Sequence, residues 1–137
     1  MREHTVRRRI EWADTDMAGI VHFARFLVFM ETAEHRFREA LGFPLGQDST
    51  NGASLGWPRV AVTCDYRRPA RFGDELEIRA RVVEQGTTSL TFAFTFSRDG
   101  ALVAEGRMTS VCCRLEPQLQ PVPIPERMAE AIEVVEE

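Results

Sequence analysis

The chain has 137 residues, of which 44% are hydrophobic, 28% charged and 9% aromatic, and its formal net charge is −4. That length suits one globular domain with a real core and is too short for two. The composition excludes a disordered chain, no apolar run is long enough to cross a bilayer, and the acidic balance argues against general nucleic-acid binding. We therefore expect a single domain over residues 1–137, with no membrane and no nucleic-acid partner.

The N-terminal residues and the cysteines bear on compartment and cofactors. Arginines occupy positions 7–9, but the continuous apolar segment of a secretory signal does not follow them, so we expect a cytoplasmic location. Cys64, Cys112 and Cys113 are too few for a disulfide framework, and no CxxC or HxxxH pairing accompanies them. Each lies in a strand-like run, which favours a buried small side chain over a nucleophile. We expect no metal and no cofactor.

The first half of the chain predicts one strand and one long helix. Residues 4–12 alternate between polar and apolar, which is typical of a half-buried strand, although Arg8 interrupts the apolar side. Gly42 is well placed to end the helix that follows, and Pro44 prevents its continuation. The helix is expected over residues 23–41, where one stripe at helical spacing holds Phe23, Phe26, Leu27, Met30, Ala33, Phe37 and Leu41.

The second half predicts antiparallel strands. Residues 43–57 are rich in glycine and proline and are expected to form a loop. Gly73–Asp74 and Asp99–Gly100 mark turns between alternating runs. A tail begins at about residue 117, with prolines at 121, 123 and 125 before an amphipathic stretch. The four expected strands are Val60–Tyr66, Leu76–Val82, Leu90–Phe96 and Leu102 to about Arg114. This order predicts an α+β domain in which a five-stranded antiparallel sheet wraps around one long central helix.

The stretch DTDMAGIVH, residues 14–22, lies between the first strand and the helix. A carboxylate placed just before a helix stands near free backbone N–H groups that can hold an oxyanion. The alternative is that Asp14 or Asp16 only caps the helix or its turn, and spacing alone favours capping. If Asp14 is only such a residue, its replacement should cost about 1 kcal/mol or less.

The longer string DTDMAGIVHFARFLVFME resembles the signature of the 4-hydroxybenzoyl-CoA thioesterase family and related bacterial acyl-CoA thioesterases, in which DxDxxGxV precedes the long helix. Residues 56–78 and 86–94 resemble the later blocks of that family, so the resemblance covers nearly all of residues 6–113. It implies a single hotdog domain that hydrolyses an acyl-CoA thioester to free acid and CoA. It also implies a homodimer or homotetramer with sites between subunits.

The same resemblance implies roles for individual residues. Asp16 would act on the thioester carbonyl as nucleophile or general base, and the backbone N–H of Phe23 would polarise that carbonyl. Gly19 matches the glycine that lets the chain bend and the ligand approach. Val21 and Trp57 lie in the matched segments and are expected to bind substrate.

Three side chains near this motif have open or auxiliary roles. Enteric relatives carry a histidine one position later than His22, so His22 could contact substrate or only shape the pocket. Glu31 occupies a place where relatives also carry an acid, and is expected to orient water or a loop. Glu34 falls within the apolar stripe, where an ion pair with an arginine, in the chain or across a subunit interface, is favoured over catalysis.

The sequence points less clearly to the residues that would bind the nucleotide end of CoA. Relatives often have basic residues in the hairpin that here spans residues 86–89, so Ser89 and its neighbours would meet the CoA phosphates with hydroxyl and N–H groups. Arg67, Arg68 and Arg71 are substitute candidates, although a solvated strand end is the simpler interpretation of this cluster.

Two rival functions remain at this point. A thioesterase for acyl groups on acyl carrier protein would need a basic docking surface, which the acidic balance disfavours. A non-catalytic hotdog module that binds acyl-CoA is disfavoured by the presence of Asp16 and Gly19.

Overall fold

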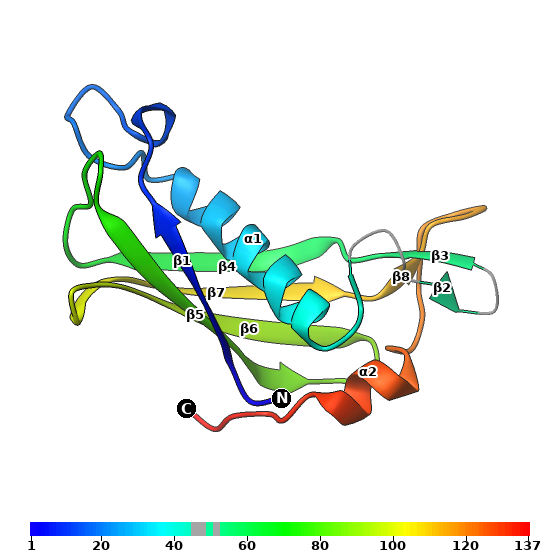
Figure 1. Cartoon of the computed structure of the whole chain (residues 1–137). Coiled ribbons are helices and arrows are strands. Elements are labelled where there is room, and N and C mark those ends of the chain that lie inside the picture. Colours follow the sequence, from blue (N-terminus) through cyan, green and yellow to red (C-terminus); the bar gives the residue numbers. More distant parts are fainter. Residues whose placement is uncertain (45–48, 51–52) are drawn as a thin grey trace.

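An antiparallel sheet with the strand order β1-β5-β6-β7-β4 is covered on one face by helix α1 (Figure 1). The computed structural model describes residues 1–44, 49–50 and 53–137. Helix α1 spans Arg25–Ala40. The strands of this sheet are β1 His4–Arg9, β4 Arg59–Tyr66, β5 Glu75–Gln85, β6 Ser89–Arg98 and β7 Ala101–Val111. The predicted five-stranded sheet around one long helix is confirmed.

Helix α1 is held by aromatic side chains that interlock with those of β6. Phe26 packs edge-on against Phe96 with ring centroids 5.2 Å apart, and Phe37 packs on Phe92 at 5.1 Å. Burying one such ring contributes roughly 1.5–3 kcal/mol, so these contacts fix the helix on the sheet. Gly42 ends the helix as predicted, with a φ of +96° that favours glycine.

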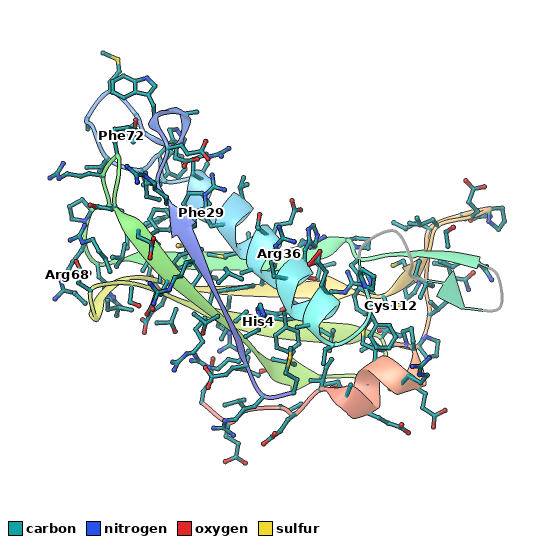
Figure 2. All side chains as sticks on the ribbon, viewed as in Figure 1. His4, Phe29, Arg36, Arg68, Phe72 and Cys112 are labelled. Atoms are coloured by element: carbon teal, nitrogen blue, oxygen red, sulfur yellow. The ribbon has the colours of Figure 1, made fainter. Side chains whose placement is uncertain are left out.

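The N-terminal end of the predicted helix was wrong by two residues. Phe23 is 65% exposed in a turn before α1, so it does not belong to the apolar stripe. Phe29, which that stripe omitted, is fully buried. Phe29 lies on the side of α1 that faces β1 (Figure 2). The Arg8 guanidinium sits 4.6 Å from its ring centroid. Arg8 therefore joins the inner side of β1 by covering an aromatic ring.

Short turns and a small second sheet flank the main sheet. A 3-10 turn at Trp12–Asp14 follows β1. The predicted turns at Gly73 and at Asp99–Gly100 are present, with positive φ angles at all three named positions. The last predicted strand is divided, because the chain leaves the main sheet after Val111. It then joins a second sheet, ordered β2-β3-β8-β9, made of β2 Ser49–Thr50, β3 Ala53–Gly56, β8 Cys113–Arg114 and β9 Gln120–Pro121.

The C-terminal tail closes the end of the core away from the β4–β5 connection. Helix α2 spans Glu126–Ala131 and buries Met128 completely. The Val135 N–H donates to the carbonyl of Val82 on β5 at 2.9 Å, which ties the tail to the sheet. No helix in the described part of the chain is long and apolar enough to span a membrane.

Candidate active site

Asp16 stands at the start of a tight reversal between β1 and α1. Its backbone N–H donates to the Ile20 carbonyl at 2.9 Å, and Gly19 closes the turn with a φ of +79°. One carboxylate oxygen, Oδ1, accepts from the Ala18 N–H at 2.8 Å. The other, Oδ2, has no hydrogen-bond partner among the residues that the structure describes. Asp16 thus caps its own turn with one oxygen, and its other oxygen stays unbonded among the described residues.

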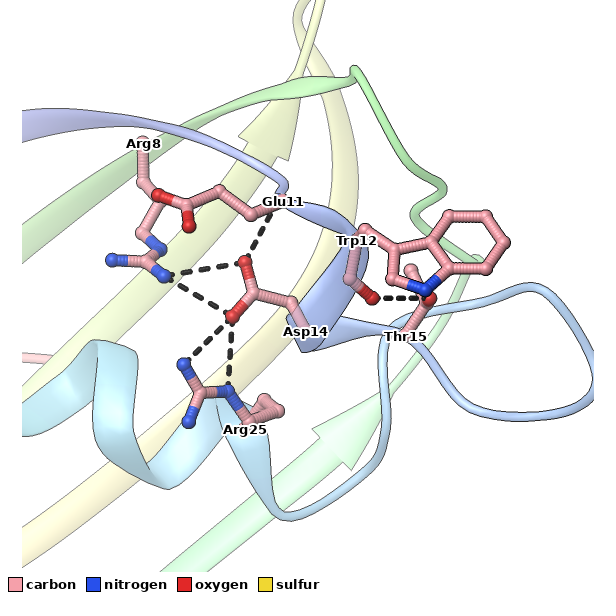
Figure 3. Close-up of polar contacts among 6 residues, drawn as sticks. All are labelled: Arg8, Glu11, Trp12, Asp14, Thr15 and Arg25. Carbon is pink, nitrogen blue, oxygen red and sulfur yellow. Dashed lines mark hydrogen bonds and ion pairs between the residues drawn. The ribbon is translucent and has the colours of Figure 1, made fainter.

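Asp14 is fully buried and is the centre of an ion-pair cluster (Figure 3). Its carboxylate accepts from both Arg8 and Arg25, at 2.7–3.2 Å, and from the Glu11 N–H at 2.9 Å. Burial alone would raise the pKa of Asp14, but the Glu11 N–H and the two guanidinium groups outweigh it and hold that pKa below its ordinary value.

The capping alternative holds for the turns, because Asp16 caps its own turn and Asp14 accepts from the N-cap N–H of the 3-10 turn. Helix α1 begins at an N-cap, Ala24, that makes no side-chain capping bond, so neither Asp14 nor Asp16 caps it. Asp14 also does more than cap a turn, because its carbonyl accepts from the His22 N–H at 2.8 Å while its side chain joins β1 to α1. A cost of about 1 kcal/mol or less is therefore too small for its loss.

The turn that leads into α1 presents a free backbone donor. The Phe23 N–H makes no hydrogen bond with any described residue. The Phe23 carbonyl accepts from the Tyr66 hydroxyl at 2.8 Å, which ties this turn to the end of β4. His22 Nδ1 accepts from the Ala24 N–H at 3.1 Å, and its ring stacks on Phe23 with centroids 4.6 Å apart. His22 thus shapes the turn, and its contact with substrate stays a prediction.

These groups meet at a cavity of about 460 Å³. Five predicted site residues line it: Asp16, Val21, Phe23, Arg67 and Arg68. Sequence reasoning missed the remaining lining residues, which are Ile20, Phe26, Tyr66, Pro69 and Ala70. Arg67 and Arg68 sit at its exposed side, and Arg68 donates to the Leu102 carbonyl at 2.6 Å. The cavity therefore joins a carboxylate, a free N–H, an aromatic wall and two cations.

Five predicted site residues do not line this cavity within one chain: Gly19 and His22 belong to the adjoining turn, and Glu31, Trp57 and Ser89 lie farther away. Glu31 is exposed on α1. Trp57 is buried under the guanidinium of Arg38, which lies 4.6 Å from its ring centroid. Ser89 begins β6 beside the hairpin that ends β5, whereas the cavity lies at the opposite end of β5. Their roles toward substrate stay predictions.

The predicted ion pair of Glu34 is confirmed, and its partner lies in the same chain. Glu34 is fully buried, and its Oε2 accepts from Arg59 at 2.7 Å. Because the pair joins the middle of α1 to the start of β4, it supports a structural role for Glu34 rather than catalysis.

The cysteines offer no activated thiol. Cys112 and Cys113 are buried, and burial is the main cause that raises the pKa of the half-buried Cys64. A raised pKa disfavours the thiolate form that a nucleophile needs. In the described ranges no group of three His, Cys, Asp or Glu side chains gathers as metal ligands would.

Known proteins resemble this chain in both sequence and fold. A model of the thioesterase-like superfamily matches residues 10–132. The chain belongs to this superfamily. The 1,4-dihydroxy-2-naphthoyl-CoA hydrolase of Synechococcus elongatus is 29% identical over 134 residues, which cover 98% of each chain. The predicted resemblance to 4-hydroxybenzoyl-CoA thioesterases is thereby confirmed at the level of the superfamily.

Solved structures of thioesterases superpose on nearly the whole of this chain. A gentisyl-coenzyme A thioesterase superposes with a TM-score of 0.85 at 28% identity, covering 95% of this chain and all of its own. A 4-hydroxybenzoyl-CoA thioesterase complexed with 4-hydroxybenzoyl-CoA has a TM-score of 0.88 at 22% identity, over 97% of this chain and 100% of that one. At that identity the likeness concerns the fold alone, and it confirms the hotdog prediction.

Proposed function

We propose that this thioesterase-superfamily chain is an acyl-CoA thioesterase that releases a free acid and CoA. One observation carries the proposal: the unpaired carboxylate oxygen of Asp16 and the unpaired N–H of Phe23 belong to residues that line one cavity. Relatives that match over nearly the whole chain are named as hydrolases of CoA thioesters. No observation favours acyl carrier protein as the donor or a module without catalysis.

The residues divide the reaction between them. Asp16 acts on the thioester carbonyl, either as nucleophile or as the base that activates water. The Phe23 N–H holds the oxyanion that forms, because a preorganised donor in a partly dry site stabilises developing charge. The C–S bond then breaks, and the thiolate of CoA leaves without needing a strong general acid. Where Asp16 is the nucleophile, water then hydrolyses the acyl–Asp16 anhydride, which releases the acid and restores the carboxylate. Gly19 and Val21 shape the turn and wall beside the carbonyl, and Arg67 and Arg68 face the CoA phosphates.

An aromatic acyl group is the substrate class that we propose to test first. Phe23, Phe26 and Tyr66 line the cavity, and Phe26 and Tyr66 form an edge-to-face pair with centroids 5.2 Å apart. Such rings favour stacking with an aromatic guest. Two relatives are named for hydroxylated aromatic acyl-CoA substrates. A panel of benzoyl-, 4-hydroxybenzoyl-, acetyl- and palmitoyl-CoA with thiol detection compares these classes.

The decisive variant is Asp16→Asn, which keeps the shape of the side chain and removes its charge. Its hydrolysis rate should fall by roughly a hundredfold or more, the lower range for losing a general base, while binding of acyl-CoA changes little. Asp99→Asn is the matched control, because Asp99 lies in an exposed hairpin at a φ of 50° that asparagine also tolerates. Near-normal turnover of Asp16→Asn would overturn the mechanism. Absence of thiol release by the wild type would favour a binding module.

We also infer a homo-oligomer, either a homodimer or a homotetramer, in the cytoplasm. Edge strand β4 has little cover, with Val60 and Val62 63% and 43% exposed, and Val28 of α1 is 42% exposed. Apolar side chains along an unpaired strand edge favour association with a second copy. Three free cysteines suit a reducing compartment.

A further inference from the structure

The end of the molecule beside the cavity carries exposed aromatic rings that the proposed chemistry does not use. Trp12 is 78% exposed and Phe72 is 58% exposed. Their rings meet edge to face, with centroids 6.1 Å apart and planes at 75°. Figure 3 shows the Trp12 ring pointing away from the Asp14 cluster, so that cluster does not hold it. An edge-to-face pair leaves ring faces free to stack on a flat guest.

Backbone pairing places this aromatic pair near the cavity. The Gly73 N–H donates to the Ile10 carbonyl at 2.9 Å, which brings the β4–β5 connection against the residues that precede Trp12. Arg71 pairs with Ile20, and Ile20 lines the cavity. Figure 2 shows Phe72 and Arg68 at the same end of the molecule. The surface from the cavity through Arg71 to Trp12 and Phe72 is called the arginine–aromatic strip below.

The charges of the strip fit an anion. Arg71 is exposed, and its guanidinium makes no hydrogen bond or ion pair with any described residue. The neighbouring carboxylate of Asp74 already accepts from Arg98 at 2.8 Å and from the Arg71 backbone N–H. Arg67 and Arg68 extend the positive side to the cavity. A guanidinium that makes no hydrogen bond beside exposed rings matches a phosphorylated adenine nucleotide, because arginine binds phosphate and aromatic rings stack on bases.

We propose that the arginine–aromatic strip binds the nucleotide end of CoA, with the adenine on the Trp12–Phe72 pair and a phosphate on Arg71. The proposal rests on the proposed function, since it assigns the part of acyl-CoA that lies outside the acyl cavity. It replaces the hairpin at residues 86–89 as the nucleotide site within one chain. That hairpin lies at the end of β5 far from the cavity.

The first test measures binding without turnover. Trp12 and Trp57 are the only tryptophans, and Trp57 is buried, so the exposed Trp12 is the fluorophore that a stacked base should quench. CoA and adenosine 3′,5′-bisphosphate should quench the wild-type protein, whereas pantetheine should not. ADP, which lacks the 3′-phosphate, tests whether any adenine nucleotide suffices, and equal binding of ADP and CoA overturns assignment to CoA. The quenching should be absent in Trp12→Phe, although affinity is retained.

The second test compares thioesters of the same acyl group on CoA and on pantetheine. Trp12→Ala and Arg71→Gln should each lower the ratio of kcat/KM for the CoA thioester to that for the pantetheine thioester by at least about fivefold, the low end for losing one stacked base. Trp12→Phe should restore most of the ratio. Arg127→Gln, an exposed arginine on α2, is the control.

The two proposals fail in different ways. An unchanged ratio in Trp12→Ala and in Arg71→Gln overturns the nucleotide site and leaves the thioesterase proposal standing. Binding of CoA that depends on Trp12 and Arg71, without hydrolysis of any thioester, overturns the proposed activity and supports the nucleotide site.

Discussion

At the scale of single residues, Tyr66 connects the end of β4 to the turn that holds the proposed oxyanion donor. Its hydroxyl donates to the Phe23 carbonyl at 2.8 Å. The pKa of Tyr66 is raised to about 12, mainly by partial burial and secondly by interaction with Cys64. The phenol therefore stays protonated, and stays a donor, throughout the pH range in which a thioesterase works.

This pKa can be measured directly because Tyr66 is the only tyrosine. Phenolate absorbance of the folded protein should rise near pH 12, whereas the unfolded chain should titrate near its ordinary value of about 10. Since the folded chain keeps a proton that the unfolded chain releases, stability should fall as pH rises through this interval. Titration of the folded protein near the unfolded value would show that burial and Cys64 do not act on the Tyr66 phenol in solution.

At the scale of elements, the ion-pair cluster around Asp14 joins β1, the 3-10 turn and α1. Asp14→Asn should lower the free energy of unfolding by about 3–5 kcal/mol, the range for breaking a buried pair, because two guanidinium groups lose their partner. Denaturant unfolding of the wild type and the variant measures the difference. Asp99→Asn should be nearly neutral, and a loss of about 1 kcal/mol or less for Asp14→Asn would restore the simple capping interpretation.

The same cluster predicts a pH dependence. The pKa of Asp14 is lowered in the folded state, so its contribution is present above the unfolded value of about 3.9 and is lost as pH falls below it. The stability gap between the wild type and Asp14→Asn should therefore narrow as the pH falls from neutral toward and through that value. A gap of constant size would mean that the charge of Asp14 is not what holds these elements together.

A second pair links α1 to β4, and a double-mutant cycle separates its structural from its catalytic role. Arg59→Met leaves the fully buried Glu34 without its partner and should cost about 3–5 kcal/mol. Replacing both residues with Met should recover a large part of that loss, since no unpaired charge remains. Turnover of the folded double variant should stay within about tenfold of wild type, because loss of a catalytic group costs far more. A collapse of turnover with intact folding would make Glu34 catalytic.

At the scale of the whole molecule, the exposed apolar side chains of β4 and α1 predict self-association. Light scattering after gel filtration should give a dimer or tetramer. Val62→Lys should shift it toward the monomer, because a charge on this strand edge cannot be buried unpaired. Leu119→Lys, at another exposed apolar position, is the control. A wild-type protein that stays monomeric at all concentrations would contradict the inferred oligomer.

The sequence by itself determined the strands of the main sheet, helix α1 and the position of the catalytic candidate, whereas β2 and β3 lie in a stretch that was expected to be a loop. Helical and strand periods and positive φ angles are local properties. They predicted most of the stripe of α1, the alternating faces of β5 and β6, and the turn glycines 42, 73 and 100. The string around Asp16 was recognisable for the same reason. The string is contiguous in the sequence, and the proposed chemistry needs only the turn that precedes one helix.

Only the tertiary structure decided how distant residues combine. Periodicity could not place Tyr66 on Phe23, join Arg59 to Glu34 or gather Arg8 and Arg25 on Asp14, since these contacts depend on the strand order β1-β5-β6-β7-β4 and on the side of the sheet that α1 covers. Two-residue strands such as β8 and β9 carry no period to detect. The exposure of Phe23 follows from the same cause, because a ring at helical spacing is buried only where the fold supplies a surface to cover it.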